Sequence, residues 1–388
     1  METIATRIKL KIKKWLTPLI TLAVAEVLTG LVLRFNVDLL VAYPVLLVLI
    51  PGLMDLRGNV YGAIGYRLTK ALHLGLTSPS LRSRFNMVNA LLGYVVSTVA
   101  TINLSFIGLA LSILTGLEAP DLISLLFISL FSTFIVYIML TPIITTSTIV
   151  MFKHGHDPSS FVATIVTGIG DFTTPAILLI MAYLHQELSY LVKLLLIVVI
   201  IALAIVFAAF VIREKESRNL VENTVSSIIA STGSSFGGFA LALSTQLISR
   251  SPEILGVLPA FNAVIGAAMG YLGSALNIDL HIEAEVPVKS YYEESAVGFI
   301  ATYFSIMLAL TLSSTPLVVD YVKLARIIGV VTASCFSVYV LSMLITYLLT
   351  TLTFKHGWDP DNVVFPVMTT FVDLIGPVVI SLTGSIVL

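Results

Sequence analysis

Two nearly identical stretches determine how this chain is organised: Phe152–Pro158 reads FKHGHDP, and Phe354–Pro360 reads FKHGWDP, 202 residues later. The same offset relates Asp171 to Asp373. Upstream, an offset of 208 relates six residues of one half to six of the other: Pro44, Pro51, Gly58, Gly62, Gly65 and His73 to Pro252, Pro259, Gly266, Gly270, Gly273 and His281. Blocks that recur in the same order at a nearly fixed offset indicate internal duplication. We therefore predict two homologous repeats.

The composition is that of a membrane protein. Of 388 residues, 57% are hydrophobic and 11% are charged, whereas a soluble domain has roughly 45–50% apolar and about 25% charged residues. This composition excludes a soluble globular protein, a disordered chain and a disulfide scaffold. With 21 Lys+Arg against 22 Asp+Glu, the chain has no basic excess. We expect membrane lipid, and no nucleic acid, as a partner.

Apolar runs long enough to cross a bilayer occur eleven times, since a helix needs about 20 mostly apolar residues to do so. These runs are 16–35, 40–76, 87–117, 122–152, 159–184, 188–212, 224–248, 253–281, 292–317, 320–354 and 361–387. The predicted fold class is an all-α polytopic membrane protein with about 11 transmembrane helices.

Five of the runs fall in each repeat, so we assign 16–186 to the first repeat and 219–388 to the second. Residues 1–15 form a basic interfacial segment. Because five crossings leave the ends of a repeat on opposite faces, the linker helix in 187–218 lets the second repeat start on the same side as the first. The repeats are then parallel, related by a pseudo-twofold axis along the membrane normal. Such an internal pseudo-dimer could act as a monomer.

The positive charges indicate the orientation. With the N-terminus in the cytoplasm, most Lys and Arg residues between the runs lie on the cytoplasmic face, including Arg67, Arg84 and Lys153. Lys323 and Arg326 are exceptions. We expect a multi-pass protein of the cell membrane whose C-terminus is extracellular.

Two aspartates are the candidate metal ligands. Asp171 and Asp373 lie about 13 residues after an Asp-Pro pair that is typical of a helix start, or roughly 20 Å along the helix. Carboxylates inside a membrane are costly and mark ion pathways. A threonine lies four residues before each aspartate, at Thr167 and Thr369, and a proline lies four residues after it, at Pro175 and Pro377. Because proline has no N–H, it cannot donate the usual helical hydrogen bond to the aspartate carbonyl. Such oxygen ligands suit a hard cation such as Mg²⁺.

The run 40–76 and its counterpart 253–281 contain the second set of candidates. Run 40–76 carries Asp55, Gly58 and Asn59 and is too long for one straight crossing, so we expect a kink or break near Pro51. Gly/Pro-interrupted segments at matching positions in two halves are typical of transporter sites.

The stretch Pro51–Asn59, PGLMDLRGN, followed by Arg67 and by His73–Gly75, resembles the signature of the MgtE family of magnesium channels. The duplicated five-helix unit is similar to solute carrier family 41. The resemblance implies transport of Mg²⁺, or of other divalent cations, through a pore between the repeats. By this resemblance Asp171 and Asp373 hold the hydrated cation, and Asn59 lines the same path.

The second repeat departs from that signature. Ala267 and Ala275 stand where Asn59 and Arg67 would be. Asn262, five residues before Ala267, is a candidate substitute, and Gly266 matches Gly58. The two half-sites are therefore expected to be unequal.

Two alternatives use the same carboxylates. Residues 168–171 spell GIGD, which is similar to the GxGD motif of intramembrane aspartyl proteases, but the second repeat has Phe371-Val372-Asp373 without the glycines. The other alternative is exchange of Mg²⁺ for Na⁺ or H⁺, because membrane carboxylates also relay protons. The paired Thr and Pro neighbours favour a cation transporter over an enzyme.

Overall fold

A computed structural model describes residues 4–156, 158–282, 288–314, 320–360 and 363–388, and gives only the backbone for 4–13 and 159–167. The described residues form thirteen helices and no strand. The helices are α1 (Ile4–Phe35), α2 (Val37–Ala42), α3 (Val45–His73), α4 (Arg84–Thr115), α5 (Leu122–Lys153), α6 (Pro158–Leu184), α7 (Tyr190–Arg213), α8 (Ser217–Ala242), α9 (Thr245–Arg250), α10 (Glu253–Ile282), α11 (Val288–Ser314), α12 (Tyr321–Lys355) and α13 (Val364–Val387).

Within the described ranges, ten helices are long and apolar enough to cross a membrane, and the Gly168–Leu184 part of α6 is a further, shorter apolar segment. The linker α7 is the most apolar of the ten. These helices confirm the prediction of an all-α polytopic membrane protein.

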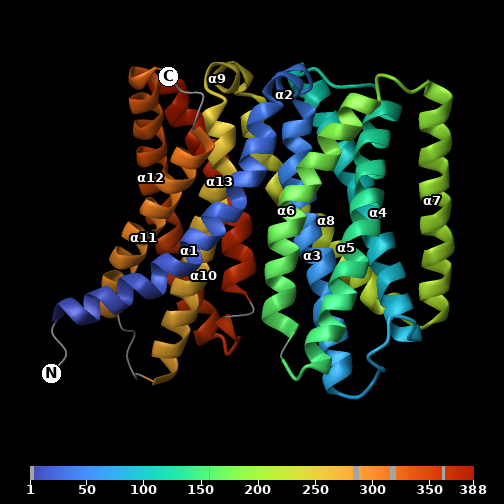
Figure 1. Ribbon diagram of the computed structural model, residues 1–388, viewed down its shortest axis with the longest axis horizontal. Coiled ribbons are helices and arrows are strands. Elements are labelled where there is room, and N and C mark those ends of the chain that lie inside the picture. The colour runs from blue at the N-terminus through green and yellow to red at the C-terminus, as the bar shows by residue number, and fades with distance from the viewer. Residues whose placement is uncertain (1–3, 157, 283–287, 315–319, 361–362) are drawn as a thin grey trace. The chain divides into compact units, whose positions relative to one another are not determined.

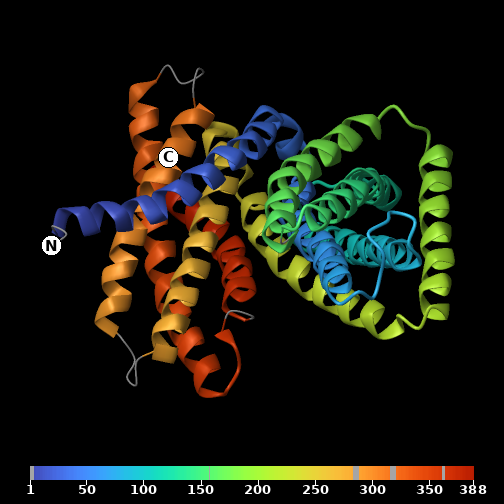
Figure 2. The same ribbon diagram turned by 60° about the horizontal axis from the view of Figure 1, so that its bottom comes forward.

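The helices form two compact units that are not contiguous in the sequence. The α10 unit contains Met1–Val37 and Ser244–Leu388, and the α3 unit contains Asp38–Leu243. In the α10 unit, α1 packs against α10 and α11, and in the α3 unit, α8 packs against α3 and α4 (Figure 1). Each unit therefore takes one long helix from the other repeat. The linker α7 packs on α4 and α5 at the edge of the α3 unit (Figure 2).

Both exchanged helices make a backbone contact through glycine. Gly238 of α8 lies against the Leu47 carbonyl of α3, and a Cβ on Gly238 would be 3.0 Å from Cδ of Pro51. Pro51 has no N–H to donate to Leu47, so the carbonyl that the proline leaves unpaired is the one that Gly238 covers. Gly30 of α1 lies against the Gly256 carbonyl of α10 in the same way. Gly30 and Gly238 are 208 residues apart, the offset of the duplication.

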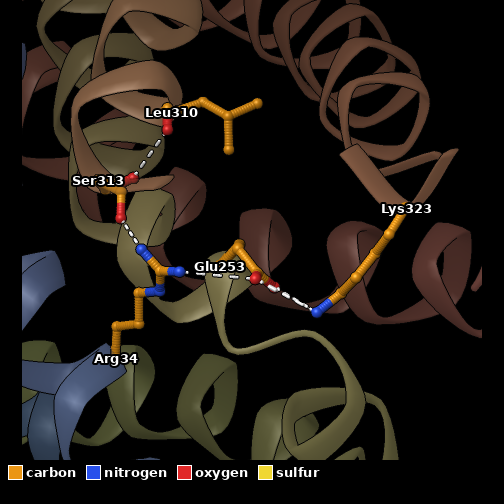
Figure 3. Close-up of polar contacts among 5 residues, drawn as sticks. All are labelled: Arg34, Glu253, Leu310, Ser313 and Lys323. Atoms are coloured by element: carbon orange, nitrogen blue, oxygen red, sulfur yellow. Dashed lines mark hydrogen bonds and ion pairs between the residues drawn. The ribbon is translucent and has the colours of Figure 1, made fainter. Parts of the chain in front are cut away.

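Polar contacts fix α1 at two places. Near its end, Arg34 lies 3.5 Å from Glu253 and donates to the Ser313 carbonyl, while Lys323 lies 3.2 Å from the same carboxylate (Figure 3). In its first half, the Trp15 indole donates to Glu294 of α11. The ion pair with Glu253 accounts for Lys323, which was an exception to the distribution of basic residues predicted for the cytoplasmic face.

The ends of the two repeats have the same local structure. The His73 ring packs edge-on against Phe152 at 5.2 Å, and the equivalent His281 packs against Phe354 at 4.9 Å. The turns that follow use Gly155 and Gly357 at positive φ, 75° and 73°, where glycine has no Cβ penalty. The duplicated FKHG sequences therefore form matching helix ends.

Two helix boundaries differ from the predicted ones. The run 40–76 is interrupted at Tyr43–Pro44, between α2 and α3, and α3 continues through Pro51 as one helix, so a break at Pro51 is wrong, whereas a kink there stays a prediction. The residue before a proline is disfavoured in helical conformation, which accounts for the break at Tyr43. In the second repeat, α13 begins at Val364 rather than at Pro360.

We predict that Gly238→Ala destabilises the protein, because the new methyl group would overlap the α3 backbone, which cannot move like a side chain. Overpacking of this kind lowers the free energy of unfolding by about 1–3 kcal/mol. The control is Gly329→Ala on α12, where a Cβ would meet nothing within 4 Å. The measurement is thermal unfolding of the purified protein in detergent, and equal midpoints for the two variants would contradict the exchanged packing.

Candidate functional site

The two candidate carboxylates occupy equivalent helices in different units. Asp171 lies on α6 in the α3 unit, and Asp373 lies on α13 in the α10 unit, and both are partly buried. Pro175 and Pro377 are buried inside the same helices, four residues later. Each helix therefore presents an aspartate whose own carbonyl lacks its usual helical donor.

In the α10 unit, α10 contacts α13 on either side of Asp373 in the sequence. A Cβ on Gly266 would lie 3.2 Å from Cγ2 of Thr369, one turn before Asp373. Gly376, three residues after Asp373, lies against the side-chain amide of Asn262. The Asn262 oxygen is buried and has no hydrogen-bond partner in the described part of the chain. The structure thus brings four of the predicted residues together around one stretch of α13.

In the α3 unit, the side chains of residues 159–167, which lie along the corresponding part of α6, are outside the described residues. Among the side chains that are described, none lies within 4 Å of a Cβ added to Gly58 or Gly168. Asn59 is partly buried, and its amide nitrogen has no hydrogen-bond partner among the described residues. The side chain of Thr167 lies outside the described residues, so its predicted role is untested.

Asp55 contacts the exchanged helix. The Ser234 hydroxyl of α8 donates to its carboxylate at 3.2 Å. In the same unit, Asn103 of α4 donates to Thr232 of α8 at 3.3 Å. Asp55 thus forms part of a polar interface between α3, α4 and α8.

Arg57 is a buried charge that sequence reasoning did not select. Its side chain is 1% exposed, and its Nη2 donates to Thr133 at 3.0 Å. Among the described residues its Nε and Nη1 have no hydrogen-bond partner within normal geometry, while the Tyr61 side chain lies close enough to interact with the guanidinium. A Cβ on Gly170, the residue before Asp171, would lie 3.8 Å from Cβ of Arg57. A fixed positive charge therefore lies beside the helix of the candidate carboxylate, and the isolated arginine within an apolar run was the available signal.

A comparison with known protein families identifies the family of this chain. The model of the MgtE divalent cation transporters matches residues 50–181 and 258–383, which together cover more than half of the chain. The chain belongs to the MgtE family. The two matched MgtE segments begin 208 residues apart and end 202 residues apart, the two offsets found in the sequence, so the tandem MgtE-like domains are confirmed. No curated protein and no solved structure matched the chain.

Membership of the MgtE family makes the protein a divalent cation transporter rather than an enzyme. The protease interpretation of the GIGD sequence at 168–171 is therefore not supported. Among the described residues, no three His, Cys, Asp or Glu side chains gather as a metal site. The candidate half-sites instead combine one carboxylate with neutral oxygens, a ligand set that suits a cation retaining part of its water shell.

The second MgtE repeat lacks the charges of the first. At an offset of 208, Asp55, Arg57 and Asn59 correspond to Ala263, Ile265 and Ala267. The predicted inequality of the half-sites thus extends to charge: the α3 unit carries a buried arginine and an extra carboxylate that have no counterpart at the matching positions of the second repeat.

We predict that Arg57→Met leaves the free energy of unfolding unchanged or raises it. Replacing a buried charge with a well-packed apolar side chain of similar volume is often neutral or stabilising. Arg57→Ala is the control, because it removes both the charge and the packing and leaves a cavity. Thermal unfolding in detergent distinguishes them. A large loss of stability for Arg57→Met would mean that the guanidinium is paired more fully than its contacts indicate.

Proposed function

We propose that this protein transports Mg²⁺ across the cell membrane, and that Asp171 and Asp373 each hold the hydrated cation. The observation that supports this proposal is one partly buried carboxylate at the equivalent position of each repeat in a member of a divalent cation transporter family. The location of the path between the two repeats stays a prediction.

The neighbouring groups suit a hydrated ion. Mg²⁺ gives up its water reluctantly and usually binds through one or two carboxylates while keeping several waters. The bound waters donate hydrogen bonds, so the protein must supply acceptors. In the α10 unit the acceptors are the buried Asn262 oxygen, the Thr369 hydroxyl and the Asp373 carbonyl, to which Pro377 cannot donate.

The two half-sites would bind the cation unequally. In the α3 unit, the charge of Arg57 next to the Asp171 helix opposes a second positive charge, and Coulomb repulsion is stronger in an apolar interior than in water. The α10 unit has Ile265 at that position. We therefore propose that Asp373 holds the ion more tightly and that Asp171 is the side from which it leaves more readily.

The proposed orientation has the N-terminus in the cytoplasm and the C-terminus outside. Basic residues occur where α3 ends, α4 begins and α7 ends: Lys70, Arg84 and Arg213. This end would face the cytoplasm according to the positive-inside rule.

We predict that Asp171→Asn and Asp373→Asn each reduce Mg²⁺ flux at least about tenfold, because a neutral amide loses the charge-assisted contact with the cation. Mg²⁺ uptake into proteoliposomes, measured with an internal fluorescent indicator, tests this expectation. Glu222→Gln is the control, because Glu222 is exposed and pairs with Arg218 on the same helix. Normal flux in both aspartate variants would contradict the proposed sites.

Exchange of Mg²⁺ for Na⁺ or H⁺ is the second candidate function, and Asp55 favours it. This membrane carboxylate occurs in one repeat only, and it accepts a hydrogen bond from the neutral Ser234 hydroxyl. An acid that is separate from the two half-sites can take up a coupling ion while they hold the divalent cation.

If Asp55 binds the coupling ion, Asp55→Asn should abolish the dependence of Mg²⁺ flux on an imposed Na⁺ or pH gradient while leaving downhill flux. Ser234→Ala, which keeps the carboxylate, should retain that dependence. The same proteoliposomes with controlled counter-ion gradients give the measurement. A gradient dependence that survives in Asp55→Asn would exclude Asp55 from coupling.

A further inference from the structure

The α3 unit contains a cavity of about 510 Å³ at the end where α3 finishes and α4 begins. Its walls come from α3, from α4 and from the turn between α7 and α8, and these segments lie together at one end of the unit (Figures 1 and 2). Volumes of about 300–1,000 Å³ are typical of small-molecule sites. None of the residues assigned to cation transport lines this cavity.

One wall of the cavity is basic. Arg84 is neutralised by Glu214, which accepts two hydrogen bonds from it at 2.7 and 2.8 Å. The carboxylate of Glu216 accepts from Asn219. Arg67 donates through Nε to the carbonyl of its own helix one turn earlier, and in the described part of the chain neither Arg67 nor Lys70 forms an ion pair. Glu216 offsets part of the charge of Arg67, so the lining, with three basic and two acidic residues, keeps an excess of one positive charge for a ligand.

Apolar side chains form another part of the lining, which we call the apolar wall. Leu76, Phe85, Val88 and Leu92 line it, and of these Leu92 and Val88 are buried, whereas Leu76 is exposed. The cavity therefore combines an excess of positive charge with an apolar surface that reaches the outside of the bundle. A ligand that satisfies both features has an anionic group joined to an apolar part.

We propose that this cavity binds an anionic phospholipid, with the headgroup phosphate at Arg67 and Lys70 and the start of the acyl chains along the apolar wall. Phosphate oxygens accept charge-assisted hydrogen bonds from guanidinium and ammonium groups. The ends of membrane helices lie at the depth of lipid headgroups, where basic side chains meet anionic lipids. The α3, α4, α7 and α8 ends that form the cavity are helix ends of this kind.

The basic pair Arg67 and Lys70 occurs in one repeat only. At the offset of 208, Arg67 and Lys70 correspond to Ala275 and Ile278, which cannot bind a phosphate. The cavity also needs the turn after α7, where Lys215 adopts a positive φ of 63°, an uncommon conformation for a residue other than glycine. A bound lipid would contact both the end of α3 and the linker between the repeats. Because α3 also carries Asp55 and Asn59, the lipid would bind the same helix as these residues.

Titration calorimetry of the full-length protein in detergent tests the proposal with three short probes. Dioctanoyl-phosphatidylglycerol carries both the anionic headgroup and the chains, dioctanoyl-phosphatidylcholine has no net charge, and glycerol 3-phosphate has no chains. We expect the first probe to bind at least about tenfold more tightly than either of the others. We expect the Arg67→Gln/Lys70→Gln variant to lose at least about tenfold of that affinity, the change for a lost charge-assisted contact.

Two further variants keep the test decisive. Lys70→Gln alone changes an exposed residue that folding does not need, and it should weaken phosphatidylglycerol binding in part. Lys355→Gln removes an exposed lysine at the end of α12 in the α10 unit and should change nothing. Equal binding of glycerol 3-phosphate would overturn the lipid assignment in favour of a free phosphate. Unchanged affinity in the double variant would place lipid binding elsewhere.

Discussion

The contact between Gly238 and the Leu47 carbonyl, with its counterpart between Gly30 and Gly256, is the constraint on which the arrangement depends. A side chain at either glycine would separate two helices whose backbones touch. Because these contacts join α8 to α3 and α1 to α10, neither repeat supplies all the helices of its own compact unit. The packing of α8 on α3 through Gly238 also brings Ser234 of α8 within hydrogen-bond distance of Asp55. The glycine contact therefore helps to position a membrane carboxylate.

The covalent link between the repeats permits a difference that a symmetric homodimer could not have. Both units keep the aspartate, the following proline and the matching histidine–phenylalanine contact. Only the α3 unit has Arg57, Asp55 and the basic cavity wall, whereas the α10 unit has apolar residues or alanine at those positions. The proposals on release of the cation, on coupling and on lipid all concern the half that carries these residues.

Much of the fold follows from the sequence, because hydrophobic length predicts spans and a fixed offset predicts duplication. The family match confirmed the tandem domains, and the helix of Asp171 begins at Pro158 as expected, whereas the helix of Asp373 begins at Val364. The helix exchange could not be predicted, because an apolar run indicates that a helix is buried but not which helix it contacts. Pro51 was expected to be a break because the sequence does not reveal that Gly238 covers the carbonyl it exposes. Arg57 was overlooked since its burial and missing partners are properties of the packing.

The most direct test of the central claim is to locate a divalent cation in crystals of the full-length protein. Mn²⁺ can replace Mg²⁺ in oxygen sites, and its anomalous scattering identifies it by position. The account predicts anomalous peaks within reach of the Asp171 and Asp373 carboxylates, with the stronger peak at Asp373, where Ile265 replaces the arginine of the other repeat. Ordered Mn²⁺ elsewhere in the membrane region, with none at either aspartate, would contradict the account.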